Sequence, residues 1–132
     1  MSIEPPVLLS IIELGGYPDY TALYRKSGFE VVSCDSVRKA VKLIRRYRPA
    51  LIVAEFNFQS DFRDRTSSLE TVFSSLQGVV DASVIVFYEK EFEHQYQRLL
   101  NQFTPFESLT FPIDETRLEQ ALLRARDALV VK

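Results

Sequence analysis

The sequence predicts an α/β protein in which helices cover both faces of a parallel sheet. Short apolar runs of strand length alternate five times with amphipathic stretches of helix length. The runs Ala50 to Ala54 and Ser83 to Tyr88 are apolar at almost every position, which is typical of strands buried on both faces. The 132 residues, 46% of them hydrophobic, suffice for one core, so we expect a single domain over residues 1–132.

The first strand is expected at Val7 to Ile12, after Pro5-Pro6 and before Gly15-Gly16. A helix should then begin near Pro18-Asp19-Tyr20 and end at Gly28. Phe29 to Cys34 follows as the second strand.

Ser36 is a candidate N-cap for the second helix, because its hydroxyl can accept a hydrogen bond from the first turn. Pro49 ends that helix, and Ala50 to Ala54 forms the third strand. The helix face consists of apolar residues spaced three and four apart: Val37, Ala40, Val41, Ile44 and Tyr47.

The second half repeats the alternation after a polar loop from Glu55 to Ser67. Strands are predicted at Ser83 to Tyr88 and Ser108 to Phe111, and Asp114 should cap the last helix. Helical faces are formed by Leu69, Val72, Phe73 and Leu76, by Phe92, Tyr96, Leu99, Leu100 and Phe103, and by Leu118, Ala121, Leu122, Ala125 and Leu129. Five such units with right-handed crossovers favour a flavodoxin-like, doubly wound sheet with strand order 2-1-3-4-5.

Composition removes several classes of function. The net charge of −2 lacks the basic excess of a nucleic-acid-binding protein. One cysteine and one histidine exclude a disulfide framework and a metal cage built on histidine and thiolate, so we expect neither metal nor cofactor. No apolar run approaches the roughly 20 residues that cross a bilayer, and the N-terminus does not resemble a secretion signal. We therefore expect a cytoplasmic protein that does not bind membranes.

Three segments resemble response-regulator receiver domains. The run Gly28 to Ala40 resembles their second strand and second helix. Arg48 to Val53 resembles the x-P-D-L-I-x-x-D run of their third strand, and Phe111-Pro112 resembles their Lys-Pro pair. The resemblance extends in order over nearly the whole chain.

The resemblance also implies where the family's chemistry would lie. The phosphoryl-accepting Asp falls on Glu55, and the Mg²⁺-binding acidic pair falls on Ile11 and Ile12. The Ser or Thr that senses the phosphoryl group falls on Tyr88, and the Lys before the cis-proline falls on Phe111.

These replacements remove the parts that phosphoryl transfer requires. Mg²⁺ binds oxygen ligands, which two isoleucines do not provide, and Phe111 supplies no charge to stabilise the transferring group. We therefore expect no catalytic residue and no enzyme. The prediction is a degenerate pseudo-receiver, a phosphorylation-independent interaction module of bacterial two-component or phosphorelay signalling. Its partners would be other signalling proteins, with a homodimer through the family's fourth helix, fifth strand and fifth helix.

Four features of the sequence each allow two interpretations. Glu55 would either imitate a phosphorylated Asp or be a solvated carboxylate. Tyr88 and Phe111 would either lock one state or anchor a partner, or else fill a vacated core. The basic second helix, residues 38–48, is either a docking patch for an acidic partner or a solvated face. The loop from Phe56 to Thr66 would present a partner surface or fold over the old site through Phe56, Phe58 and Phe62.

Two other functions remain as alternatives. In the first, a phosphoryl-accepting regulator uses a rearranged acceptor in the 56–66 loop, where Asp61 and Asp64 stand. In the second, a flavodoxin-like domain binds a small ligand at the carboxyl ends of its strands.

Overall fold

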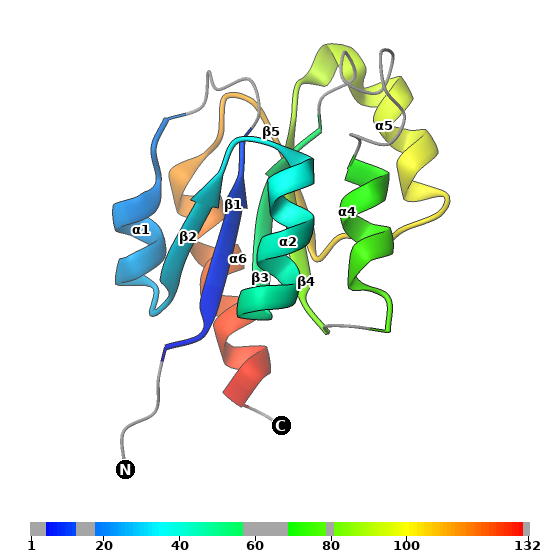
Figure 1. Cartoon of the computed structure of the whole chain (residues 1–132). Coiled ribbons are helices and arrows are strands. Elements are labelled where there is room, and N and C mark those ends of the chain that lie inside the picture. Colours follow the sequence, from blue (N-terminus) through cyan, green and yellow to red (C-terminus); the bar gives the residue numbers. More distant parts are fainter. Residues whose placement is uncertain (1–4, 13–17, 57–68, 79–80, 131–132) are drawn as a thin grey trace.

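The computed structural model describes residues 5–12, 18–56, 69–78 and 81–130 (Figure 1). The strands are β1 (Val7–Ile11), β2 (Glu30–Cys34), β3 (Leu51–Glu55), β4 (Ser83–Tyr88) and β5 (Glu107–Thr110). The helices are α1 (Thr21–Lys26), α2 (Val37–Tyr47), α4 (Leu69–Leu76), the short 3₁₀ helix η2 (Lys90–Phe92), α5 (Glu93–Leu100) and α6 (Glu115–Val130).

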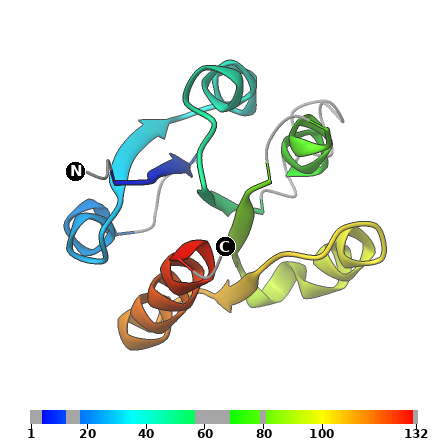
Figure 2. The same cartoon turned by 90° about the horizontal axis from the view of Figure 1, so that it is seen from below.

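The five strands form one parallel sheet in the order β2-β1-β3-β4-β5. This is the predicted flavodoxin-like order, and the fold class is confirmed. Helices cover both faces of the sheet: α1 and α6 lie on one side, and α2, α4 and α5 lie on the other (Figure 2). Because all strands run the same way, their carboxyl ends meet at one edge, which is where ligands bind in open α/β sheets.

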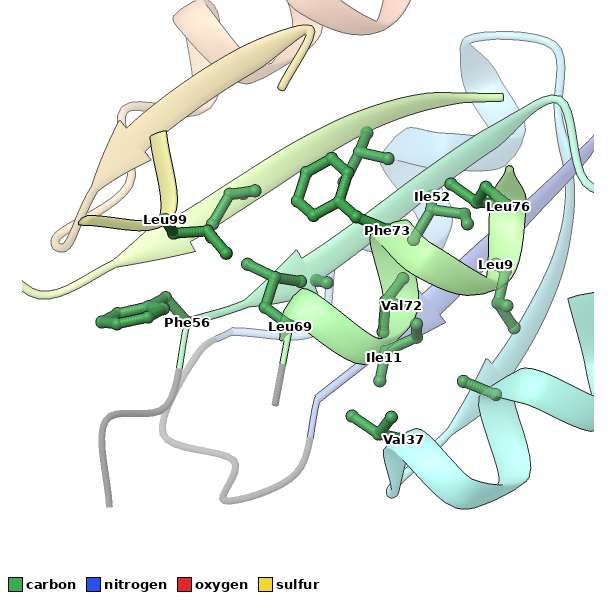
Figure 3. Close-up of a cluster of buried hydrophobic side chains, with 14 of the residues drawn as sticks. Leu9, Ile11, Val37, Ile52, Phe56, Leu69, Val72, Phe73, Leu76 and Leu99 are labelled. Carbon is green, nitrogen blue, oxygen red and sulfur yellow. The ribbon is translucent and has the colours of Figure 1, made fainter. Parts of the chain in front are cut away.

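The sheet divides the hydrophobic core into two halves. The half beneath α2, α4 and α5 contains Leu9, Ile11, Ile52, Phe56 and Tyr96, and part of it is drawn in Figure 3. The half beneath α1 and α6 contains Leu8, Leu51, Val53, Phe87 and Leu118. Neighbouring strand residues enter opposite halves because side chains alternate along a strand.

Local signals begin and end α2, and begin α6, as predicted. The Ser36 hydroxyl accepts a hydrogen bond from the Lys39 N–H at 3.1 Å and caps α2. The Asp114 carboxylate accepts from the Thr116 and Arg117 N–H groups and caps α6. Arg48 ends α2 in a left-handed conformation with φ of 46°, and the proline that follows it prevents further helix.

The strand ends differ from prediction by one residue. β3 covers Leu51–Glu55 where Ala50 to Ala54 was expected, so Glu55 belongs to the strand and not to the loop. The last strand is Glu107–Thr110, which leaves Phe111 just beyond it. β3 is longer at its end because its ladder pairing continues to Glu55, past the point where the apolar pattern stops.

Candidate functional site at the carboxyl ends of the strands

The predicted site residues come together at one edge of the sheet. β1 ends at Ile11, β3 at Glu55 and β4 at Tyr88. The ladder places Ile11 opposite Ala54 and Glu55 opposite Phe87. The Phe111 N–H donates to the Tyr88 carbonyl at 2.9 Å, so these two residues are neighbours as expected.

Ile11 and Ile12 point into opposite halves of the core. Ile11 is 2% exposed and packs in the half that contains Val37 and Phe56 (Figure 3). Ile12 is half-buried against the other half and donates its N–H to the Cys34 carbonyl at 3.2 Å. Neither side chain offers an oxygen ligand to a cation, and a carboxylate in place of Ile11 would replace core packing.

Glu55 lies half-buried at the end of β3, directly before a core residue. The Phe56 N–H donates to the Phe87 carbonyl at 2.7 Å, which holds the chain beside β4. Phe56 is 6% exposed and its ring is tilted against Tyr96, with centroids 5.3 Å apart. The first phenylalanine of the predicted loop is therefore a core residue.

Other residues singled out from the sequence lie outside the described part of the chain. They are Gly15, Gly16, Phe58, Asp61, Phe62 and Asp64. The partner-surface and lid interpretations of the loop, and its two candidate acceptors, stay predictions.

Tyr88 and Tyr96 form a tyrosine cluster beside β4 and β5. The ring of Tyr88 stacks on that of Tyr96 with centroids 4.4 Å apart. The Tyr96 and Ser108 hydroxyls are 2.6 Å apart and share a hydrogen bond, so the cluster joins β4, α5 and β5. The Tyr88 hydroxyl is 3.4 Å from the Glu93 carboxylate.

Burial changes the acidity of these phenols. It raises the pKa of Tyr96 to about 12, while the Ser108 hydrogen bond opposes the rise. Burial, and then the neighbouring Glu93 carboxylate, raise the pKa of Tyr88. Both phenols therefore remain protonated and neutral at neutral pH.

Tyr96 and Ser108 were not predicted as site residues. The sequence placed Tyr96 on the inner face of a helix, where a buried phenol needs a hydrogen-bond partner. That requirement was the available signal, but it does not identify Ser108, which belongs to another element.

Phe111 lies at the surface and not in the vacated core. Its side chain is 42% exposed, and its peptide bond to Pro112 is cis. Core filling thus describes Tyr88, which is packed against the core, better than it describes Phe111.

A groove of about 870 Å³ opens beside the ends of β1 and β2. Ser10 and Ser33, which are register partners, lie in its wall with Ile12 and Phe87. Its border also carries polar and charged residues of two helices and their caps: Asp19, Tyr20, Asp35, Lys39, Lys42 and Arg46.

Both carboxylates at the border of the groove already have hydrogen-bond donors. The Asp19 carboxylate accepts from the N–H and hydroxyl of Thr21, and the hydroxyl is the main reason that the pKa of Asp19 is lowered. The Lys39 ammonium donates to Asp35 at 2.9 Å, which lowers the pKa of Asp35. The cations Lys42 and Arg46 are exposed.

No group of three or more His, Cys, Asp or Glu side chains in the described residues is arranged to hold a metal ion. Within the same ranges, no helix combines the length and the apolar character needed to cross a membrane.

Comparison with known proteins gives structural matches alone. No protein-family model matches the sequence, and no curated protein matches it significantly. A response regulator receiver domain protein from Clostridium thermocellum superposes with a TM-score of 0.73 at 15% identity, covering 95% of this chain and 98% of that one.

Two further structures agree. The signal receiver domain of an HD domain-containing protein from Pseudomonas fluorescens Pf-5 gives a TM-score of 0.76 at 13% identity, over 97% of this chain and 99% of that one. The N-terminal signal receiver domain of a two-component response regulator from Bacteroides fragilis gives 0.69 at 19% identity, over 91% and 96%. The chain therefore has the receiver-domain fold.

Proposed function

We propose that this receiver-fold chain is a signalling module that binds other proteins without being phosphorylated. The observation that supports this most is the burial of Ile11, which is 2% exposed where receivers place a metal-binding carboxylate. A carboxylate at that point would be surrounded by core side chains. The usual Mg²⁺ and phosphoryl chemistry thus lacks a metal ligand at this position, where a carboxylate would also be desolvated.

The remaining positions support the same proposal. Phe111 presents an uncharged ring where a lysine would pair with phosphoryl oxygens. Tyr88, at the sensing position, stacks on Tyr96 and has its hydroxyl beside Glu93. A small hydroxyl side chain that moves toward a phosphoryl group is replaced by a large ring held against its neighbours. This contact opposes movement of the side chain at position 88.

The direct test is treatment with beryllofluoride and Mg²⁺, followed by two-dimensional NMR of the backbone amides. We expect no shift of the amides at residues 54–56, 88 and 111. Acetyl phosphate should likewise leave a single band on a phosphate-affinity gel. A stoichiometric beryllofluoride adduct at Glu55 would refute the proposal.

The alternative acceptor in the 56–66 loop is tested by the same gel. Wild type is compared with Asp61→Ala and Asp64→Ala after incubation with acetyl phosphate. A phosphorylated band in wild type that is lost in one variant would establish that residue as a relocated acceptor. The phosphorylation-independent function would then be wrong.

The proposal includes a homodimer through α5, β5 and α6. β5 is an edge strand. The Glu107 carboxylate on it accepts a hydrogen bond from the Arg124 guanidinium of α6 at 3.1 Å. Arg117 lies 3.7 Å from the same carboxylate, so this face carries a small charge network. Such networks give an interface register and specificity.

Sedimentation velocity over a range of concentrations tests the dimer. Arg124→Glu would place like charges beside Glu107 and should weaken association, while Arg25→Glu on the exposed surface of α1 should not. A wild-type protein that stays monomeric at its highest soluble concentration would contradict the dimer.

A further inference from the structure

The outer face of α2 carries a surplus of positive charge. The segment 38–48 contains six basic and no acidic side chains, whereas the rest of the chain has ten basic and 18 acidic ones. Arg38, Lys39, Lys42, Arg45 and Arg46 are all exposed, and Val37, Ala40 and Ile44 are buried. Successive helix residues turn by about 100°, so the five cations share an arc of about 120° directly opposite the buried residues.

Only some of these basic side chains have a role in stabilising the fold. Lys39 forms an ion pair with Asp35, but both side chains are more than half exposed, so the pair contributes little. Arg45 and Arg46 lie in the last turn, where cations complement the helix dipole. Among the described residues, Arg38 and Lys42 form no ion pair. Their charge is available to a partner.

Three of the cations border the groove beside β1 and β2. Lys39, Lys42 and Arg46 follow one another along α2, and the first and last are about 10 Å apart along the helix axis. The groove of about 870 Å³ next to them has an apolar component from Ile12, Leu43 and Phe87. The surface therefore combines a row of positive charge with room for an apolar side chain. We call this row and groove the α2 surface.

We infer that the α2 surface binds an extended acidic segment of a partner protein, with an apolar side chain in the groove. This rests on the proposed protein-binding function. A chain in the extended polyproline II conformation has three residues per turn and advances about 3.1 Å per residue. Two carboxylates three residues apart therefore lie on the same side of the chain and span the row from Lys39 to Arg46. A long polyanion such as nucleic acid fits less well, because the rest of the chain carries eight more acidic than basic side chains.

The test uses a fluorescein-labelled peptide with two glutamates three residues apart and a phenylalanine between them, followed by fluorescence anisotropy at low ionic strength. Lys42→Glu combined with Arg46→Glu should weaken binding by about tenfold or more, since two attractions become repulsions. The matched control is Arg98→Glu, an exposed cation of α5 remote from the groove residues. Circular dichroism checks that each variant is folded.

A second control keeps the protein and changes the probe. The same peptide with glutamine in place of both glutamates should bind at least about tenfold more weakly to wild type. Equal binding of both peptides, or equal loss in Arg98→Glu, would overturn the inference.

Two further outcomes would assign the α2 surface to another occupant and overturn the inference. One is self-association that Lys42→Glu abolishes, which would make a second copy the occupant. The other is a small molecule retained by the purified protein in native mass spectrometry and displaced by the peptide. Peptide failure with an inert beryllofluoride response would reject this inference alone. A beryllofluoride adduct would reject the proposed function, whether or not the peptide binds.

Discussion

The phenol ring of Tyr88 stacks on that of Tyr96, with centroids 4.4 Å apart and planes 26° apart. This contact joins the end of β4 to the middle of α5. The Tyr96 hydroxyl continues the connection to Ser108 on β5. These contacts connect α5 and β5, which belong to the predicted dimer face, to Tyr88 at the predicted site.

Removing the Tyr96 hydroxyl should weaken this connection. Tyr96→Phe keeps the ring but leaves the Ser108 hydroxyl without its partner, so the free energy of unfolding should fall by about 1 kcal/mol. Urea denaturation followed by circular dichroism measures the change. Tyr47→Phe, which removes a hydroxyl from a side chain that is 40% exposed, should be neutral. Equal effects of the two substitutions would contradict a role for the hydrogen bond.

Stability should fall at high pH through the same residue. The folded protein holds the Tyr96 proton with a pKa of about 12, whereas an unfolded tyrosine has a pKa near 10. Because the folded pKa is the higher one, this contribution is complete below about pH 10 and is lost as pH rises through about 12.

The variant Tyr96→Phe separates the pH-dependent stability contributed by Tyr96 from that contributed by other tyrosines. The pKa of Tyr24 is also raised by burial, so wild type and variant should both lose stability in alkali. The loss should be less steep in the variant. Near-ultraviolet absorbance of tyrosinate, recorded alongside urea denaturation, gives both quantities. Identical pH profiles would show that Tyr96 titrates as in the unfolded chain.

Restoring the family's acidic pair should damage the fold unequally. Ile11→Asp places a carboxylate at a position that is 2% exposed and should cost about 4 kcal/mol or more. Ile12→Asp falls on a half-buried side chain at the groove and should cost distinctly less. Thermal and urea denaturation with and without Mg²⁺ provide the comparison. Stabilisation of Ile11→Asp by Mg²⁺ would show that a carboxylate at the end of β1 can reach a cation, and would contradict the argument from the burial of Ile11.

Two glycines allow a matched test of backbone conformation. Gly28 has φ of 100° and Gly78 has φ of 73°, so an alanine at either position should cost about 1–2 kcal/mol. A Cβ at Gly28 would also lie 2.9 Å from Arg126 Nε, whereas one at Gly78 would meet nothing within 4 Å. Gly28→Ala should therefore be the more destabilising of the two in urea denaturation. The reverse order would mean that Arg126 moves aside without cost.

The fold could be predicted because its signals are local. The unbroken apolar run at β3 and the Ser36 cap each act within a few residues. The cap is found as expected, and β3 lies one residue further along the chain than predicted. The opposite placement of Ile11 and Ile12 is likewise a local property, because side chains alternate along a strand.

The cluster at the site could not be predicted in the same way. Tyr96 and Ser108 belong to different elements, and their contact depends on how α5 lies against β5. Phe56 stands in a polar stretch of sequence, yet it is buried because the chain continues along β4 for one residue past the strand. Such facts depend on tertiary packing, which a local pattern does not contain.

The direction of the chain has a practical consequence for experiments. β1 begins and α6 ends at the side of the sheet opposite the carboxyl ends of the strands (Figure 1). An affinity tag, a fluorophore or a surface-immobilisation handle joined before β1 or after α6 would thus be attached on the side away from the groove and the tyrosine cluster. The carboxyl ends of the strands would then face the solution.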